Sequence, residues 1–435
     1  MLTPRPYQLD LVARARAAFL GTRSVLAVLP TGGGKTQVGS MVVEGALAKR
    51  LRVLWLAHRR ELVDQAASRL PGEVGVLMAG RRARPAPVQV ASIDTIADRD
   101  DLPPADLIVY DEAHHVVART SRDLLARYPG ARVLGLTATP CRSDGTALGD
   151  VFEALVSGPT VRELIAEGHL VEADVIGPTD EGKALAADPV AAWRAHAGGR
   201  PGFLFAKTVA SSREYAAALT AAGIPAAHVD GTTARTAREA AIDGFRRGRI
   251  DVLSSVQVFT EGVDCPRAAV CMLARGCDHQ GTYLQMVGRV LRPAPGKTRA
   301  LVIDLVGAAH RHGLPDDDRE WSLSGEPIRD RDAAIALTQC PECGAVWRAG
   351  VRRTCLRCGW EMPSPEAMPV SERPIEDLRA RLAGALRARA SPESQAKKLE
   401  ELRGIAAAKG YKSTWVGMKF KAIFGHWPRN QKETA

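Results

Sequence analysis

The chain has 435 residues, of which 46% are hydrophobic and 25% are charged, the balance of an ordinary globular protein. Because a single hydrophobic core stops growing near ~250–300 residues, this length predicts two to four domains. The net charge of +10 favours an anionic partner, nucleic acid before membrane, and the lack of a signal-like start or a membrane-length apolar run predicts a cytoplasmic protein without a membrane partner.

Short apolar runs alternate with amphipathic stretches through most of the chain. Runs typical of buried strands lie at residues 24–29, 52–57, 87–92, 106–111 and 132–137. The pattern then starts again, with runs at residues 202–207, 226–231, 251–256, 269–274 and 300–305. Alternation of this kind indicates a parallel sheet with helices on both faces. The sequence therefore predicts two α/β units in series, bridged by the polar stretch 177–189.

The character of the sequence changes after residue 305. An acidic stretch at 313–327 predicts a connector, a cysteine cluster follows, and a Pro-rich stretch at 361–374 predicts a second linker. The remainder is rich in Ala, Leu, Arg and Glu, which favours helices. The predicted domains span residues 1–176, 177–312, 335–362 for the cysteine-bearing part, and 375–435 for a basic helical region.

The first apolar run leads directly into PTGGGKT, residues 30–36. Glycines let backbone N–H groups close around a phosphate, Lys35 can reach the β and γ oxygens, and the Thr36 hydroxyl can bind Mg²⁺. The usual pattern has Gly or Ala at the position of Leu29, which is a departure. A glycine turn that binds nothing is the competing interpretation, but the strand before and the helix after favour a phosphate site.

Two carboxylates and two imidazoles follow the apolar residues 107–109, in the segment YDEAHH (residues 110–115). Ligands of open α/β sheets bind at the carboxyl ends of strands, where this segment lies. There Asp111 can hold the Mg²⁺ shell while Glu112 orients and deprotonates an attacking water. His114 is placed to sense the state of the nucleotide, whereas His115 has an equal chance of a purely structural role.

Together with GLTATPCRSDG (residues 135–145) and QMVGRVLRP (residues 285–293), these segments resemble the ordered motifs of the superfamily 2 helicases of the DEAD/DEAH-box type. The RPYQ start, the VLRP ending and the appended cysteines are most similar to the RadD-type DNA repair helicases and their phage-borne relatives. The resemblance implies two tandem RecA-like domains, followed by a small zinc ribbon and a helical basic C-terminal region.

The resemblance also assigns roles to individual residues. It implies that Gln8 reads adenine and that Thr137 and Thr139 link hydrolysis to movement, together with His114. The catalytic set is Lys35, Asp111, Glu112, Gln285, Arg289 and Arg292, with Mg²⁺ held by Thr36 and Asp111. The ATP-binding set is Arg5, Gln8, Pro30, Thr31, Gly32, Gly33, Gly34, Lys35, Thr36 and Asp264. Gln285 lies one helical turn before Arg289, so both are expected to project toward the cleft.

Candidate nucleic-acid contacts follow other predicted strands. They are His58, Arg59, Arg60, Ser92, Thr95, Lys207, Thr208, Gly231, Thr232 and Gly262. Small hydroxyls and loop amides suit phosphates, which carry no sequence information, so binding is expected to be sequence-independent and to weaken with salt. For each of these residues taken singly, ordinary loop polarity is the alternative interpretation. The family context favours DNA over RNA, and a single-stranded-DNA-binding protein is a conceivable partner that the sequence does not identify.

The cysteine cluster consists of CPEC (residues 340–343) and CLRC (residues 355–358), each followed by Gly. Two such knuckles bring four thiolates into a tetrahedron, which predicts a structural Zn²⁺ site at Cys340, Cys343, Cys355 and Cys358. An iron–sulfur cluster or a redox pair is the alternative. Arginines at 348, 352, 353 and 357 make the ribbon basic, which suits either DNA or a solvated face.

The tail interleaves aromatic residues with lysines around Trp415, Phe420, Phe424 and Trp427. Such aromatics can stack on bases, although packing within a small helical domain is the favoured interpretation. For the whole chain, the sequence predicts an ATP-dependent DNA helicase or translocase, with a role in repair or recombination. An RNA helicase, a restriction-type translocase subunit, or a clamp that uses ATP only as a switch are the alternatives.

Overall fold

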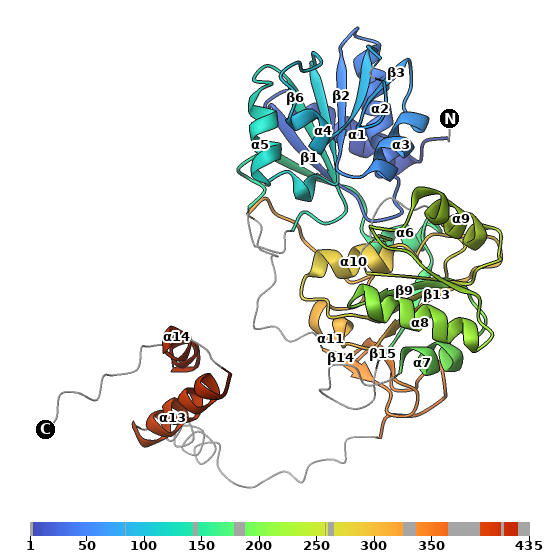
Figure 1. Ribbon diagram of the computed structural model, residues 1–435, viewed down its shortest axis with the longest axis vertical. Helices are drawn as coiled ribbons and strands as arrows, with labels where there is room; N and C mark the ends of the chain where they lie inside the picture. Colours follow the sequence, from blue (N-terminus) through green and yellow to red (C-terminus); the bar gives the residue numbers. More distant parts are fainter. Residues whose placement is uncertain are drawn as a thin grey trace, which may run out of the picture. The chain divides into compact units, whose positions relative to one another are not determined.

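The computed structural model describes residues 3–82, 84–141, 147–177, 188–256, 258–259, 265–324, 336–363, 392–409 and 413–424. Two compact units divide the chain, one at residues 1–362 and one at residues 363–435. The larger unit contains two α/β domains (Figure 1), and the smaller one contains a pair of helices. In the described part of the chain, no helix combines the length and the apolar character that crossing a bilayer requires.

The first domain is built on a seven-stranded sheet in the order β3-β4-β2-β5-β6-β1-β7, and every pair in it is parallel. Its strands are β1 (Ser24–Val28), β2 (Val53–Ala57), β3 (Val74–Leu77), β4 (Val88–Ser92), β5 (Leu107–Asp111), β6 (Arg132–Thr137) and β7 (Ala154–Ser157). Its helices are α1 (Pro6–Ala18), α2 (Lys35–Leu47), α3 (Arg60–Arg69), α4 (Ile93–Ala97), the short 3₁₀ helix η1 (Ala113–His115) and α5 (Arg119–Ala126).

Helices cover both faces of this sheet, as Figure 1 shows. Leu11 of α1 and Val38 of α2 pack with Val25 and Trp55 on one face, whereas α4 and α5 pack on the other face. The central strands are buried along their whole length, which is the property that makes such strands continuous apolar runs in the sequence. The five predicted strands of this domain are confirmed as β1, β2, β4, β5 and β6.

The second domain has an eight-stranded sheet in the order β10-β11-β9-β12-β13-β8-β15-β14. Its strands are β8 (Glu172–Ile176), β9 (Gly202–Ala206), β10 (Ala226–His228), β11 (Val252–Ser255), β12 (Val270–Ala274), β13 (Arg299–Asp304), β14 (Leu337–Gln339) and β15 (Ala345–Arg348). Its helices are α6 (Val161–Ala166), α7 (Pro189–His196), α8 (Val209–Ala221), α9 (Arg235–Arg246), α10 (Gln280–Gly288) and α11 (Ala308–His312). The five strands predicted for this domain are confirmed as β9 to β13.

Two features of the second domain differ from the sequence expectation. The predicted boundary at residues 176/177 is wrong, because β8 pairs with β13 of the second sheet and Leu164 packs in the second core. The chain leaves the first sheet at Ser157, where β7 ends, and enters the second sheet at Glu172, where β8 begins. The cysteine ribbon is not a separate body either, since β15 pairs antiparallel with β8 and extends the sheet. An edge strand with unpaired backbone groups favours such a cover.

The smaller unit consists of α13 (Pro392–Lys409) and α14 (Ser413–Phe424). Leu402 and Ala406 of α13 pack against Val416 and Phe420 of α14, with Trp415 at the margin. The prediction that Phe420 belongs to a small core is therefore confirmed. Trp427 lies outside the described residues.

Candidate functional site

The predicted phosphate loop lies between β1 and α2, and α2 begins at Lys35. Gly32 and Gly34 have φ values of +90° and +91°, a conformation that favours glycine. Gly34 is the N-cap of α2, so the free N–H groups of the first helical turn lie at this loop, where they stabilise anions. A Cβ at Gly34 would lie 2.3 Å from Nε2 of Gln8, so a larger residue would have to displace the Gln8 amide as well as adopt a strained backbone.

Leu29 replaces the small residue that is usual at its position. Its side chain is 1% exposed and belongs to the core between the sheet, α1 and α2. A Cβ at Gly33 would lie 2.8 Å from the Leu29 Cγ. The leucine therefore packs directly beneath the loop and supports its glycine turn.

The predicted acid pair stands at the end of β5 and is buried. Asp111 and Glu112 are each 5% exposed. Glu112 has a φ of 51°, in the left-handed region that a residue other than glycine rarely adopts. Its backbone N–H donates to Oδ1 of Asp111 over 3.1 Å, and its Oε1 lies 3.4 Å from the Lys35 ammonium. Strained backbone of this kind is a feature of functional sites, where it fixes the direction of a side chain.

His114 connects this acid to the next predicted motif and to the second domain. Its Nδ1 lies 3.6 Å from Oε2 of Glu112 and 3.2 Å from the Thr137 hydroxyl. Its Nε2 lies 3.2 Å from Nε2 of Gln285 on α10. Because the Gln285 amide nitrogen donates, Nε2 of His114 accepts, and the proton of the neutral ring is on Nδ1. Thr137 continues the chain by donating to the Thr139 carbonyl over 3.1 Å.

One face of α10 approaches three elements of the first domain. Gly281, Gln285 and Gly288 are spaced four and three residues apart, so they share this face. A Cβ at Gly281 would lie 3.3 Å from the Thr139 hydroxyl, and a Cβ at Gly288 would lie 2.5 Å from Cβ of Thr31 in the phosphate loop. The two glycines let the helix come close, and Gln285 contacts His114 between them.

The predicted arginines complete the same cavity. Arg289 caps the C-terminal end of α10 and is 6% exposed. Arg292 follows, and its Cγ would lie 3.3 Å from a Cβ built at Gly32 of the phosphate loop. One cavity of about 450 Å³ is lined by residues of both domains. Its lining includes Lys35, Thr36, Asp111, Glu112, Arg289 and Arg292.

The donor set of this cavity fits the implied ligands. Thr36 and Asp111 offer a hydroxyl and a carboxylate oxygen, the ligand types that Mg²⁺ prefers. Lys35 and the two arginines supply positive charge for a triphosphate. The volume is within the usual range for a small-molecule pocket.

The other end of the cavity is lined by Arg5 and Gln8 at the start of α1. Oε1 of Gln8 accepts from the Arg5 backbone N–H over 3.0 Å, and its Nε2 donates to the Gly33 carbonyl over 3.0 Å. The Tyr7 hydroxyl donates to the same carbonyl over 2.8 Å. Gln8 thus ties α1 to the phosphate loop, and its contact with adenine stays a prediction.

Two residues at this end were missed by sequence reasoning. The rings of Tyr7 and His169 lie 5.4 Å apart, and His169 lines the cavity from the start of the second domain. The place of Tyr7 beside Gln8 in RPYQ was the available signal. No sequence signal marked His169, because its approach to Tyr7 depends on the packing of the two domains.

Residues 1–142 match the family model described as the type III restriction enzyme res subunit, and residues 191–294 match the helicase conserved C-terminal domain. A 51.5 kDa protein of a Lactococcus phage is 30% identical over 365 residues, which are 78% of each chain. The chain belongs to the superfamily 2 helicases of the DEAD/DEAH type. It is accordingly an ATP-hydrolysing enzyme, and the family implies ATP and Mg²⁺.

Further likenesses agree with this family. The DNA 3'-5' helicase XPB of Mycobacterium tuberculosis is 29% identical over 68% of this chain. The chain spans 52% to 61% of the length of four such curated helicases. A variant of Saccharomyces cerevisiae Dbp5 bound to RNA and ADP BeF3 has the same fold, with a TM-score of 0.55 and 18% identity over 71% of this chain and 91% of that one. The narrower resemblance to RadD-type helicases stays a prediction.

Several predicted nucleic-acid contacts of this helicase also have structural partners. Thr208 caps α8 by accepting from the Ser211 N–H over 3.1 Å. Thr232 bonds to Asp230 through its N–H and its hydroxyl, over 2.8 Å and 2.7 Å. The remaining candidates lie at strand ends, in the loops that follow, or in the helices α3 and α4. They are His58, Arg59, Arg60, Ser92, Thr95, Lys207 and Gly231, and their contacts with nucleic acid stay predictions.

Arg59 forms a contact between the helicase domains, since its guanidinium donates to the Val258 carbonyl over 3.3 Å. Glu61 on α3 forms a second one with Arg238 of α9. Both contacts lie next to predicted nucleic-acid residues. Gly262 and Asp264 lie outside the described residues.

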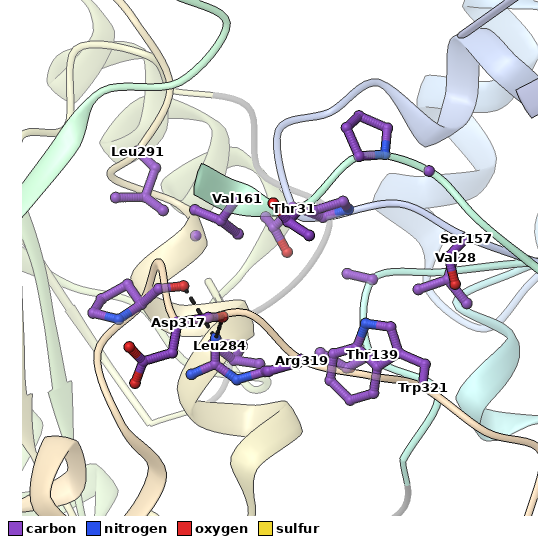
Figure 2. Close-up of a pocket in the computed structure, with 17 residues that line it drawn as sticks. Val28, Thr31, Thr139, Ser157, Val161, Leu284, Leu291, Asp317, Arg319 and Trp321 are labelled. Atoms are coloured by element: carbon purple, nitrogen blue, oxygen red, sulfur yellow. Dashed lines mark hydrogen bonds between the residues drawn. The ribbon is translucent and has the colours of Figure 1, made fainter. Parts of the chain in front are cut away.

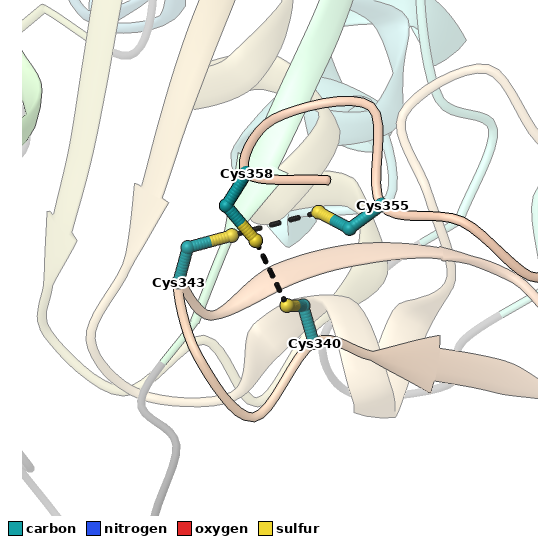
Figure 3. A group of neighbouring side chains, drawn as sticks. All are labelled: Cys340, Cys343, Cys355 and Cys358. Carbon is teal, nitrogen blue, oxygen red and sulfur yellow. Dashed lines mark hydrogen bonds between the residues drawn. The ribbon is translucent and has the colours of Figure 1, made fainter. Parts of the chain in front are cut away.

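The four predicted zinc ligands come together in the ribbon (Figure 3). The sulfur atoms of Cys340 and Cys358 lie 3.5 Å apart, and those of Cys343 and Cys355 lie 3.6 Å apart. A tetrahedron with Zn–S bonds of about 2.3 Å has edges of about 3.8 Å, so the spacing fits this metal. Both knuckle glycines have positive φ, and the N–H of Gly344 donates to the Cys340 carbonyl over 3.0 Å.

Residues 313–324, called the strap here, run from the second domain back to the first. Trp321 and Leu323 pack against the core of the first domain, and the Leu323 carbonyl accepts from the Gly149 N–H over 2.9 Å. Figure 2 shows Arg319 and Trp321 beside Thr139 and Thr31, around a small cavity of about 90 Å³. The predicted connector is therefore a packed bridge behind the phosphate loop.

Proposed function

We propose that the protein is an ATP-driven motor that moves along DNA without sequence preference and hydrolyses ATP between its two RecA-like domains. One observation carries this proposal. Lys35, Asp111 and Glu112 of the first domain line the same cavity as Arg289 and Arg292 of the second. A nucleotide in this cavity would bind both domains at once. Its hydrolysis would therefore change the position of one domain relative to the other.

The chemistry follows from the residues around the cavity. Loop N–H groups and Lys35 bind the phosphates, and Thr36 and Asp111 would hold an Mg²⁺ ion that would supply charge neutralisation there. Glu112 accepts the proton of the attacking water. Arg289 and Arg292 neutralise the charge that develops in the transition state, an effect of about 10³–10⁵ in rate in related enzymes. Release of the phosphate removes the anion that both arginines bind, and the cleft can open.

His114 and Gln285 supply a route from hydrolysis to movement. The contact of His114 with Glu112 and its hydrogen bond with Gln285 join the water-activating acid to α10. A change at Glu112 on hydrolysis alters its contact with the His114 ring and thereby the bond of His114 to the second domain. This route agrees with the predicted coupling role of His114, Thr137 and Thr139.

DNA is the proposed track. The net charge of +10 suits any nucleic acid, the relative XPB is named a DNA helicase, and the RadD-like features favour a role in DNA repair or recombination. The Dbp5 structure contains RNA, so an RNA helicase is the second candidate. A cytoplasmic location and a single-stranded-DNA-binding partner belong to the same proposal.

ATPase rates measured with single-stranded, duplex and forked DNA and with RNA test the proposal, with Lys35→Ala as the blank. We expect stimulation by DNA that falls steeply as salt rises, because phosphate contacts release counterions. Stronger stimulation by RNA would favour the second candidate. If Glu112→Gln hydrolysed ATP at the parent's rate, Glu112 would not activate the water, and the result would support the alternative in which ATP acts only as a switch.

We also propose that the four cysteines hold one structural Zn²⁺ per chain. The sulfur spacing supports this, and four thiolates leave no open position for catalysis. Metal analysis of the purified protein should give one zinc, released by a chelator. Iron or no metal at all would contradict the proposal.

A further inference from the structure

Lys297 lies outside every motif that the sequence singled out. It stands in the turn between Arg292 and β13, where the Lys297 N–H donates to the Ala294 carbonyl over 3.0 Å and Gly296 has a φ of +74°. This turn directs the lysine side chain back toward the segment that bears Arg292. The side chain is half-buried there.

The ammonium of Lys297 is surrounded by backbone carbonyls. Its Nζ donates to the carbonyls of Arg292 and Ala268, over 2.6 Å each, and to that of Pro266 over 3.2 Å. An ammonium has three N–H donors, so these three bonds use all of them. Hydrogen bonds from a charged donor are about twice as strong as neutral ones.

The three acceptors belong to two different segments of the second domain. Arg292 lies after α10, and Pro266 and Ala268 lie before β12. Arg292 and Pro266 both line the nucleotide cavity, whereas Ala268 is buried in the domain core. Lys297 therefore joins two parts of the cavity wall to each other and to the core.

We infer that Lys297 is a positioning residue for Arg292, whose guanidinium it holds in place for ATP hydrolysis by fixing the backbone carbonyl of the same residue. This inference rests on the proposed function, since it assumes that Arg292 acts on the nucleotide. Lys297 does not line the cavity, so it acts through Arg292 and not by touching the substrate.

The size of the expected effect follows from the role of the arginine. An arginine at this place contributes about 10³–10⁵ in rate, and a misplacement of about 1 Å costs about 10²-fold. Loss of the three bonds frees the segment that bears Arg292 from its neighbour and shifts the guanidinium without removing it. We therefore expect Lys297→Met to lower kcat about 10- to 100-fold and to change KM for ATP less than about 3-fold.

Four variants of the full chain test this: Lys297→Met, Lys297→Arg, Arg292→Ala, and the double variant with Met at 297 and Ala at 292. Lys297→Arg keeps the charge and should recover most of kcat. The double variant should be no slower than Arg292→Ala alone, because a residue that acts only through Arg292 has no effect once that side chain is gone. Lys49→Met, on an exposed lysine just after α2, is the matched control.

The outcomes separate this inference from the proposed function. If Arg292→Ala hydrolysed ATP at the parent's rate, the role of the arginine and the role of Lys297 would both fail. If Arg292→Ala were slow and Lys297→Met were not, or if the two losses multiplied in the double variant, only the Lys297 inference would fail. Should Lys297→Met not fold, Lys297→Gln, which keeps two donors, gives the same comparison.

Discussion

Gly288 of α10 provides a direct test of the joint nucleotide site. Replacing it with alanine adds a Cβ that would lie 2.5 Å from Cβ of Thr31 and 3.0 Å from its Cγ2. Carbon atoms of different side chains prefer about 3.5–4.0 Å. The helix and the phosphate loop must therefore separate by about 1 Å, which also moves Arg289 at the end of the helix.

The expected loss is in catalysis and not in folding. A displacement of about 1 Å between reacting groups costs about 10²-fold in rate. Alanine favours a helix over glycine by about 0.5–1 kcal/mol, which offsets part of the strain from the contact. We expect Gly288→Ala to lower kcat for ATP about 10- to 100-fold, with a melting temperature within a few degrees of the parent.

Two further variants make the test specific. Thr31→Gly removes the other partner of the contact, so in the double variant kcat should rise again toward that of Thr31→Gly alone. Gly404→Ala on α13, where a Cβ meets nothing within 4 Å, is the control for a helical glycine. Gly288→Ala with the parent's kcat and KM would refute the close approach of α10 and the phosphate loop, and with it the shared site.

Three more predictions follow from named contacts. Gln285→Ala removes the bond to His114 that joins the domains, so DNA-stimulated hydrolysis should fall more than DNA-independent hydrolysis; equal losses would contradict a coupling role. Burial and the charge of Arg292 lower the pKa of Lys297 to about 7, so its ammonium is complete below that pH and lost above it. The kcat of the parent should therefore fall, relative to Lys297→Arg, as pH rises through about 7. Parallel pH profiles of kcat for the two proteins would count against the positioning role of Lys297. Removal of zinc should lower the unfolding temperature of the second domain, because Cys340 and Cys355 belong to its core, and an unchanged temperature would show that the ribbon is independent.

The sequence predicted the central strands well because burial on both faces makes them unbroken apolar runs. It missed β3, β7 and β8, which are partly exposed and at or near sheet edges, so their apolar stretches are shorter than those of the central strands. The missed β8 explains the misplaced domain boundary. Strand pairing is a tertiary property, and a half-buried strand such as Glu172–Ile176 has the composition of an ordinary loop.

The site shows the same division between local and long-range signals. Lys35, Asp111 and Glu112 were predictable because their chemistry requires fixed positions beside a strand end or a helix start. The left-handed backbone of Glu112 and the contacts of Tyr7, His169 and Lys297 were not, because each depends on how close two distant segments approach. Gly281 and Gly288 bear a weak signal, a seven-residue spacing on the face of α10 that also presents Gln285.

The ribbon arginines bear on how the cysteine cluster serves the enzyme. All four have contacts inside the described chain: Arg348 with Asp316 and Asp317, Arg352 with the Trp347 ring, Arg353 with the Met362 carbonyl, and Arg357 with His196. Arginines that already have such contacts are less available to DNA. The ribbon therefore offers fewer DNA contacts than its number of arginines indicates. The contact of Arg348 with Asp317 instead joins the ribbon to the strap, whose Trp321 lies beside Thr139. A metal held by the four cysteines would thus stabilise a hairpin that covers the sheet edge at β8, and through Arg348 it would also support the strap between the two α/β domains.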